Sequence, residues 1–253
     1  MPTHRERIVD QFTQQAVPFS GAPGIKDERA LALLVDASGA GPDDTVLDVA
    51  CGPGLVVAAF ARTVRHATGI DVTPAMLARA RELTAGLPNV TLDQGDVLPL
   101  PYADGTFSIV VSRFAFHHFQ DPRAVLTEMR RVCRSGGRVV LCDLMASDDP
   151  AKAEAFHEIE MLRDPSHVRA LPLAELEALY AAIGLAPPTR TFYSLRFELE
   201  GLLERSFPRP EDVETIRAAY TAAVDGDTLG LGTHRVGNEI RSAYRVVILA
   251  APR

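Results

Sequence analysis

Residues 45–54 read Thr45-Val46-Leu47-Asp48-Val49-Ala50-Cys51-Gly52-Pro53-Gly54, an apolar, β-branched run that breaks into small residues and glycines. The run has the length of a buried strand, and the stretch that follows, Leu55–Ala61, has the composition of a buried helix. Strand, glycine turn and helix form the opening unit of a doubly wound α/β sheet. A ligand can lie against bare backbone in such a turn, at the N-terminus of the helix. Residues 45–61 therefore predict a ligand-binding turn at the centre of the fold.

The rest of the chain continues this alternation. Further strands are expected at 66–70, 90–93, 107–112, 138–144, 189–199 and 242–250. Helices are expected at 5–19, 26–37, 55–64, 74–85, 122–134, 151–162, 173–183 and 211–224. Strands joined by helical crossovers lie parallel, so we expect an α/β fold with a doubly wound, mostly parallel, seven-stranded sheet. The expected organisation is a single domain over residues 1–253, divided into N-terminal helices (1–40), a ligand-binding core (41–145), extra helices and a late strand capping the carboxyl edge of the sheet (146–235), and a last strand (242–250).

Composition narrows the class of protein. The chain has 253 residues, 47% of them hydrophobic, and a formal net charge of −7 with no Lys/Arg stripe, which argues against binding to nucleic acid. No apolar run approaches the roughly 20 residues of a membrane span, and Met1–Glu6 lacks the apolar core of a signal peptide. The three cysteines lie in apolar contexts without a C-x-x-C pair, which favours buried, reduced thiols. We expect a cytoplasmic monomer or homodimer that binds neither nucleic acid nor membrane.

Charge selects the ligand of the glycine turn. A dinucleotide-binding turn follows the pattern G-x-G-x-x-G/A, and here Gly52 and Gly54 fit its first two places while Val57 occupies the third. Asp48 precedes the turn, where a carboxylate would repel the pyrophosphate of NAD. S-adenosyl-L-methionine (SAM) carries a sulfonium and an ammonium and no phosphate, so the same carboxylate attracts it. The turn is therefore interpreted as a SAM site.

Two further acids follow successive strands. Asp71 ends the strand at 66–70, where its two oxygens could accept both ribose hydroxyls, or it could serve as a turn residue before Thr73-Pro74. Asp96 follows the strand at 90–93 and could accept from the adenine amine, or be a turn acid after Gly95. The carboxyl ends of parallel strands share one edge of a sheet, which makes a chance grouping of three acids there less plausible.

These motifs, taken in order, resemble a known family. Val46–Gly54, Gly69-Ile70-Asp71, Gly95–Tyr102 and Phe114–Pro122 are similar to the successive motifs of class I SAM-dependent methyltransferases, and most similar to the branch of ubiquinone and menaquinone biosynthesis methyltransferases. The resemblance covers about residues 45–145. It departs at Ala50, where the family most often has its first glycine.

The resemblance implies a cofactor site, an activity and a product. Asp48, Ala50, Gly52 and Gly54 would border the methionine part of SAM, and Asp71 would take the ribose. The other implied cofactor contacts are Val72 and Met76 beside the adenine, Asp96 and Val97 over the base, Ser112, Arg113 and Phe114 at the methionine end, and Gln14 and Phe19 from the N-terminal helix. The activity implied is SAM-dependent methyl transfer (EC 2.1.1.-) to carbon, nitrogen or oxygen of a small organic metabolite, which leaves S-adenosyl-L-homocysteine.

Candidate catalytic residues are histidines. Methyl transfer is an in-line displacement that mainly needs the acceptor held in near-attack geometry, and a base matters only for a protonated, weakly acidic acceptor. His117 and His118 are the nearest titratable groups after the fourth strand, and adjacent residues point differently, so at most one is expected to face the substrate. Both could instead orient the loop through hydrogen bonds to backbone.

A second polar segment, Arg163–Arg169, lies between two helices of the expected cap. His167 and Arg169 could hold an anionic or carbonyl-bearing acceptor, with His167 also a candidate catalytic residue, or Asp164 and Arg169 could simply pair and cap the next helix. Asp143, at the end of the fifth strand, is a further candidate for the acceptor pocket, or a strand-end turn residue.

Some classes are disfavoured and others stay open. Ser112-Arg113-Phe114-Ala115 replaces the (N/D)-P-P-(Y/F) tetrad of amino-methylases and supplies no carboxylate cluster for metal-assisted catechol methylation. No metal site is expected. The open alternatives are a non-catalytic SAM-binding protein and a SAM-binding enzyme that catalyses another reaction. An NAD(P)-dependent oxidoreductase is a third alternative, which Asp48 and Val57 disfavour.

Overall fold

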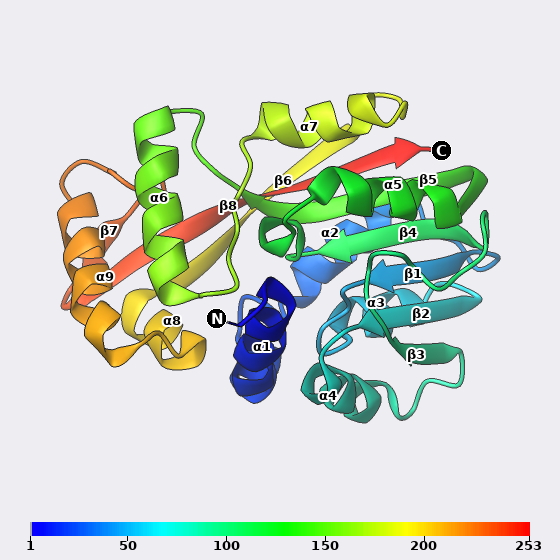
Figure 1. Ribbon diagram of the computed structural model, residues 1–253, viewed down its shortest axis with the longest axis horizontal. Coiled ribbons are helices and arrows are strands. Elements are labelled where there is room, and N and C mark those ends of the chain that lie inside the picture. Colours follow the sequence, from blue (N-terminus) through cyan, green and yellow to red (C-terminus); the bar gives the residue numbers. More distant parts are fainter. Residues whose placement is uncertain (1) are drawn as a thin grey trace.

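A computed structural model of the chain describes residues 2–253. One sheet runs through the molecule in the order β3-β2-β1-β4-β5-β8-β6, and the short strand β7 pairs with β8 (Figure 1). Its strands are β1 (Thr45–Val49), β2 (His66–Asp71), β3 (Val90–Gln94), β4 (Phe107–Arg113), β5 (Cys133–Met145), β6 (Thr189–Glu198), β7 (His234–Val236) and β8 (Glu239–Pro252). The first five strands are parallel, and β8 lies antiparallel to both β5 and β6. The sequence-based prediction of a doubly wound, mostly parallel sheet is confirmed.

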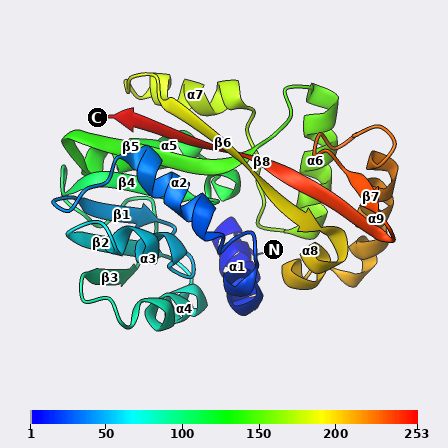
Figure 2. The ribbon, with the colours of Figure 1, turned by 180° about the vertical axis from the view of Figure 1, so that it is seen from behind.

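Helices cover both faces of the sheet. They are α1 (His4–Gly21), α2 (Glu28–Ser38), α3 (Leu55–Ala61), α4 (Pro74–Thr84), α5 (Pro122–Val132), α6 (Pro150–Arg163), α7 (Leu173–Ala182), α8 (Leu199–Ser206) and α9 (Pro210–Ala223), with a short 3₁₀ turn at Phe116–His118. Figure 1 shows α5 and α7 over one face, and Figure 2 shows α2 and α3 over the other. Among residues 2–253, no helix combines the length and the apolar character that a bilayer span requires.

Alternating side chains of each central strand divide the core into two clusters. In β1, Val46 joins the cluster under α2 and α3, whereas Leu47 and Val49 join the cluster under α5 and α7. This is the period-two pattern of a strand buried on both faces, because successive side chains point to opposite sides of a sheet. Cys51, Cys133 and Cys142 are buried and unbridged, as predicted.

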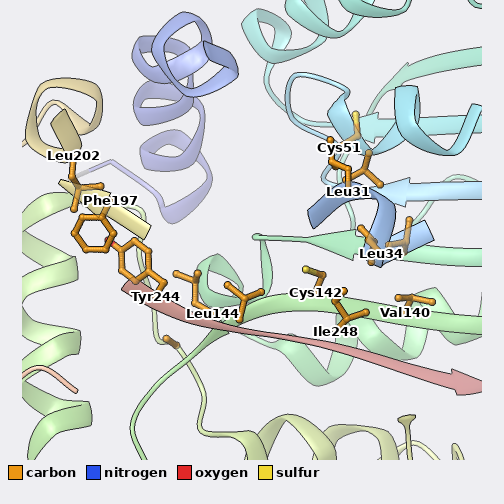
Figure 3. Close-up of a cluster of buried hydrophobic side chains, with 14 of the residues drawn as sticks. Leu31, Leu34, Cys51, Val140, Cys142, Leu144, Phe197, Leu202, Tyr244 and Ile248 are labelled. Carbon is orange, nitrogen blue, oxygen red and sulfur yellow. The ribbon is translucent and has the colours of Figure 1, made fainter. Parts of the chain in front are cut away.

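β6 and β8 extend beyond the end of β5, and the extension has its own cover of α6, α8 and α9 (Figures 1 and 2). The cluster under α2 continues without a break along β8 into this region, from Cys142 and Ile248 to Leu144, Phe197 and Tyr244 (Figure 3). The rings of Phe197 and Tyr244 stack with centroids 4.6 Å apart. The extension therefore shares one core with the rest of the sheet.

Several elements differ from expectation. Strand β5 begins at Cys133 rather than at 138, inside the helix expected at 122–134, because Cys133 pairs with Phe107 of β4 ahead of a register shift. The sheet has eight strands rather than seven, because residues 234–236 fold back on the start of β8 as a short hairpin strand. Helix α8 begins directly after β6 and was not expected, although residues 199, 202, 203 and 206 are buried at helical spacing. Helix α1 continues through Pro18 to Gly21, two residues beyond the expected end.

Candidate functional site

The glycine turn uses left-handed backbone at three residues. Ala50, Gly52 and Gly54 have φ angles of 58°, 51° and 81°, so the chain reverses sharply between β1 and α3. A Cβ on Gly54 would lie 2.8 Å from the Cβ of Ala80 in α4, so this glycine permits close packing of the two helices. At Ala50 the family glycine is favoured for its φ rather than for its size, and an alanine there strains the backbone.

Val57, which departs from the dinucleotide pattern, is accommodated by a glycine in the neighbouring strand. A Cβ built on Gly69 of β2 would lie 2.7 Å from Cγ2 of Val57. The close approach of helix and strand that the dinucleotide pattern obtains from a small helical residue is here obtained from Gly69. A small residue is therefore still required at this helix–strand contact, but here it lies in the strand and not in the helix.

Asp71 ties the end of β2 to the turn. Its Oδ2 accepts from the backbone N–H of Gly52 at 2.8 Å, and its Oδ1 from that of Thr73 at 2.8 Å. Burial raises the pKa of Asp71, and the two backbone donors act against that shift. Each oxygen keeps a second lone pair, and the side chain lines the cavity described below, so both the turn role and the ribose role remain chemically available.

Asp48 is the most unusual group of the site. Its side chain lies at the end of β1 and is 1% exposed, and neither carboxylate oxygen has a hydrogen-bond partner among residues 2–253. Burial raises the pKa of Asp48 well above its usual range, the charge of Asp71 adds to the shift, and Arg113 opposes it. A buried carboxylate without donors is unfavourable in the free protein and fits a ligand that brings a cationic donor.

Arg113, at the end of β4, provides the opposite charge. Its Nη1 donates to the carbonyl of Ile25 at 3.0 Å, and its guanidinium carbon lies 4.2 Å from the ring centroid of Phe114. Nε and Nη2 are buried and have no partner among the described residues. Asp48 and Arg113 thus present an unpaired acceptor and an unpaired donor to one cavity, a combination that matches the ammonium and carboxylate of a free amino-acid group.

This first cavity, of about 510 Å³, lies at the carboxyl ends of β1, β2 and β4. The expected cofactor contacts that line it are Asp48, Ala50, Gly52, Asp71, Val72, Met76, Asp96, Val97, Arg113, Phe114 and Phe19. Asp96 also accepts from the N–H of Val97 at 2.7 Å, so it shapes its own turn while facing the cavity. Gly54 does not line the cavity, because it packs against Ala80 of α4. Ser112 is turned to the carbonyl of Val49.

Helix α1 lies across the carboxyl ends of the strands, between α4 and α8 (Figure 1). The Nε2–H of His4 donates to the carbonyl of His118 at 2.7 Å, and the side-chain amides of Gln11 and Gln15 both donate to the carbonyl of Ser206. Gln14, which was expected to cover the cofactor, does not line the cavity: it is exposed and bonds to the carbonyl of Asp10 in its own helix.

The phase of α1 explains this difference. Phe12 and Phe19 are seven residues apart and share one face, and both line the cavity, whereas residue 14 lies two positions beyond Phe12, on another face. The aromatic residues, rather than the amide, are what the N-terminal helix contributes to the site.

His117 is held by Asp143. The Nδ1 of His117 lies 2.6 Å from Oδ1 of Asp143, whose Oδ2 accepts from the backbone N–H of His117 at 3.1 Å. Burial lowers the pKa of His117, but the charge of Asp143 and its hydrogen bond outweigh burial, so the pKa is raised overall. Asp143 lines neither cavity, and its carboxylate is engaged by His117, so its expected contact with the acceptor gains no support from the structure.

His118 has a different set of partners. Its Nδ1 lies 3.1 Å from Oγ of Ser166, and this hydroxyl lies 2.5 Å from Oδ1 of Asp164. Ser166 has one hydroxyl proton, which it donates to Asp164, so it accepts from Nδ1–H of His118, and Nε2 then carries the free lone pair. Burial and the charge of His117 lower the pKa of His118 to about 4. His118 is therefore neutral at pH 7, with its tautomer set by Ser166.

Two candidate residues of segment 163–169, His167 and Arg169, line neither cavity, whereas Arg163 and Asp164 line the second cavity described below. His167 is buried with both ring nitrogens unpartnered among the described residues, and burial and the neighbouring His117 lower its pKa. Its ring packs 5.4 Å from that of His157 and 5.7 Å from that of His117. Arg169 forms two 2.8 Å hydrogen bonds to Glu175 of α7 and faces away from the site. The geometry gives no support to acceptor contacts of His167 and Arg169, which stay predictions, and Arg169 pairs with Glu175 rather than with Asp164.

A second cavity of about 320 Å³ adjoins the first. Five residues line both cavities: Phe12, Phe19, Ile25, Phe114 and His118. His118 thus lies where the two spaces meet, and His117 borders only the second. Residues 2–253 contain no group of three or more His, Cys, Asp or Glu side chains arranged to hold a metal ion.

Sequence reasoning missed most of the far wall of this second cavity. That wall comes from β6, α8 and the start of β8 and includes Leu195, Phe197, Leu202, Arg205 and Tyr244. The period-two pattern of residues 189–199 predicts strand β6, and the apolar residues of α8 recur at helical spacing. Neither pattern indicates that these elements face α1 and His118.

Comparison with known proteins agrees with this geometry. Residues 47–141 match the family described as "Methyltransferase domain". YcgJ of Bacillus subtilis, named an uncharacterized methyltransferase, is 33% identical over 243 residues, covering 92% of this chain and 96% of that protein. Its crystal structure superimposes with a TM-score of 0.82 at 28% identity, covering 89% of this chain and 98% of that one. A demethylmenaquinone methyltransferase of Mycobacterium sp. is 32% identical over 166 residues, covering 65% of this chain and 70% of that protein.

The unpaired Asp48 and Arg113, the glycine turn at the carboxyl end of β1 and these relatives lead to the same conclusion. The chain belongs to the class I SAM-dependent methyltransferases.

Proposed function

We propose that the chain transfers a methyl group from SAM, held in the first cavity, to carbon, nitrogen or oxygen of a small organic acceptor in the second. The observation that carries this proposal is the pair of adjoining cavities with His118 on the lining of both. In-line displacement needs donor and acceptor side by side in a dry space, and the shared lining is mostly aromatic or aliphatic.

The residues of the first cavity fit the donor. Asp48 would accept from the ammonium of the methionine part, and Arg113 would donate to its carboxylate, which would give partners to both buried groups. Asp71 would accept from the ribose, and Met76 and Val97 would border the adenine. When bound, SAM supplies a methyl group already activated by the positive sulfur.

His118 would accept the proton that a hydroxyl or amine acceptor loses as it is methylated. A base with a pKa of about 4 is unprotonated at neutral pH, though weak. Weakness suffices for a hydroxyl acceptor, because an oxygen that gains a methyl group before losing its proton becomes a strongly acidic oxonium. Ser166 and Asp164 would act as positioning residues, since they hold the tautomer that leaves Nε2 free.

Labelled methyl transfer tests this function. The protein is incubated with SAM carrying a trideuterated methyl group and with fractionated small metabolites, and products are identified by mass. We expect S-adenosyl-L-homocysteine and a labelled product. Binding of SAM without any transfer would contradict the proposal in favour of a SAM-binding protein, and binding of NAD(P) in place of SAM would contradict it altogether.

The role of His118 has its own test. His118→Asn keeps a donor for Ser166 and removes Nε2, so kcat should fall by about 10²–10⁴-fold with little change in KM. His234→Asn, on the exposed strand β7, is the matched control. An unchanged kcat in His118→Asn would remove His118 from the reaction. The cytoplasmic location, the monomeric or homodimeric state and the absence of nucleic-acid and membrane partners stay predictions.

A further inference from the structure

The second cavity has an apolar body. Phe197 and Tyr244 form a stacked pair in its wall, Leu202 lies beside them, and Leu144 continues the surface toward β5 (Figure 3). Phe12 and Phe19 of α1 close the opposite side. Rings and branched side chains on facing walls favour a flat, apolar molecule, since burial of its surface is worth about 25 cal/mol per Å².

Most charged groups on this lining already have partners. Arg163 is paired with Glu160, a fully buried carboxylate that lies 2.6 Å away, and its Nη1 also donates to Ser206 at 2.9 Å. Glu198 accepts from two backbone N–H groups at the start of α8. Asp164 is bound to Ser166. Each of these groups therefore has a hydrogen-bond partner of its own within the protein.

Arg205 differs from these groups. It lies in the last turn of α8, half-buried, and no hydrogen bond or ion pair within residues 2–253 engages its guanidinium. Burial lowers the pKa of Arg205 and the charge of Arg163 adds to this effect, whereas Tyr244 and the carboxylate of Glu198 act against it without forming a hydrogen bond or ion pair with the guanidinium. Arg196, at the rim, also has no hydrogen bond or ion pair within residues 2–253 but is exposed, so Arg205 is the deeper of the two guanidiniums on this lining.

We infer that the acceptor is a flat, apolar organic acid whose single anionic group, a carboxylate, binds Arg205. This inference rests on the proposed function, because it orients the opposite end of the acceptor toward His118 and the first cavity. A planar guanidinium binds a carboxylate through two parallel hydrogen bonds. One guanidinium balances one negative charge, and the carboxylate of Glu198 nearby disfavours a second one, so a monoanion is favoured over a phosphate or diphosphate.

The test uses two probes of one shape and different charge, 2-naphthoate and its neutral amide, 2-naphthamide. Binding of each is measured by isothermal titration to the protein saturated with S-adenosyl-L-homocysteine. Because a hydrogen bond to a charged group is stronger than one to a neutral group, we expect wild type to bind the carboxylate at least about tenfold more tightly than the amide. Arg205→Gln should reduce that preference to less than about twofold, with the affinity for the amide unchanged.

Matched variants separate a specific site from general charge effects. Arg81→Gln removes an exposed charge from α4 and should keep the full preference for the carboxylate. Phe197→Ala should weaken both probes while preserving their ratio. Equal affinity of wild type for the two probes, binding of neither, or a preference that survives Arg205→Gln would overturn the inference.

The outcomes also distinguish this inference from the proposed function. S-adenosyl-L-homocysteine bound together with equal probe affinities would overturn the anionic acceptor and leave methyl transfer standing. A carboxylate preference that depends on Arg205 in a protein that binds no SAM would support the anion site and contradict the transfer. Phosphate esters of naphthalene bound more tightly than 2-naphthoate would overturn the assignment of a carboxylate.

Discussion

Asp48→Asn is the substitution for which the structure makes opposite predictions in two assays. In the free protein both carboxylate oxygens of Asp48 are buried without donors, so replacing the charge with an amide should leave the free energy of unfolding unchanged or raise it by about 1 kcal/mol. With SAM bound, the same replacement removes a charge-assisted hydrogen bond to the ammonium, worth about 1.5–3 kcal/mol. SAM should therefore bind about 10- to 150-fold more weakly.

Isothermal titration and urea unfolding measure the two effects. Asp36→Asn, an exposed acid on α2, is the matched control and should change neither quantity. Wild type at a SAM concentration 100 times its Kd should gain about 2.7 kcal/mol, and the variant much less at the same concentration. Undiminished SAM affinity in Asp48→Asn, or a loss of stability in the absence of ligand, would refute the assignment of Asp48 to the ammonium.

The dependence of SAM binding on pH follows from the same carboxyl group. Its pKa is raised in the free protein, mainly by burial, and a bound ammonium favours the ionised form. Binding then releases a proton, so affinity should rise with pH until the free carboxyl is ionised. Titrations in buffers of different ionisation enthalpy count that proton, and Asp48→Asn should abolish its release.

Three further predictions concern stability, and each is measured by urea or thermal unfolding of the ligand-free protein. Gly69→Ala should destabilise by about 1–3 kcal/mol because its Cβ would lie 2.7 Å from Val57, and an unchanged stability would mean that the strand and helix are not in that contact. Ala50→Gly should stabilise by about 0.5–1 kcal/mol, since alanine at a φ of 58° is strained; a loss of stability would contradict the turn geometry. The pKa of His118 is about 4 when folded and about 6.5 when unfolded, so the unfolded chain takes up the proton first, and about 3 kcal/mol should be lost as pH falls from 6.5 to 4. His118→Asn should lose less over that interval, and an equal loss in both proteins would place the acid sensitivity elsewhere.

Local patterns predicted the cofactor half of the molecule well. The strands at 45–49, 66–71, 90–94 and 107–113 were expected within one residue of their observed bounds. The central strands β1 and β4 are buried apolar runs between turn residues, and the edge strand β3 follows the same alternation with helices. Asp48, Asp71 and Asp96 were expected at one edge because parallel strands all end there. That consequence of topology needs no knowledge of side-chain packing.

The second cavity could not be predicted in the same way, because its walls are brought together by contacts between distant parts of the chain. His118 meets Ser166 across 48 residues, and Gln11 of α1 meets Ser206 across 195. The sequence of 163–169 allowed Arg169 to face a ligand or to pair with Asp164, and tertiary structure gave it Glu175 instead. The hydrophobic periodicity of a short segment predicts its secondary structure but not its partners at such distances along the chain.

The sequence by itself thus determined the doubly wound sheet, the glycine turn and the ring of acids that receives a cationic cofactor, since each follows from strand and turn propensities read over short windows. Only the tertiary structure decided that His118 lines both cavities and that Arg205 lies on the second without a hydrogen-bond partner. Both features depend on how α1, α8 and the long strands β6 and β8 pack around the second cavity. Its walls come from both ends of the chain, so no short stretch of sequence determines them.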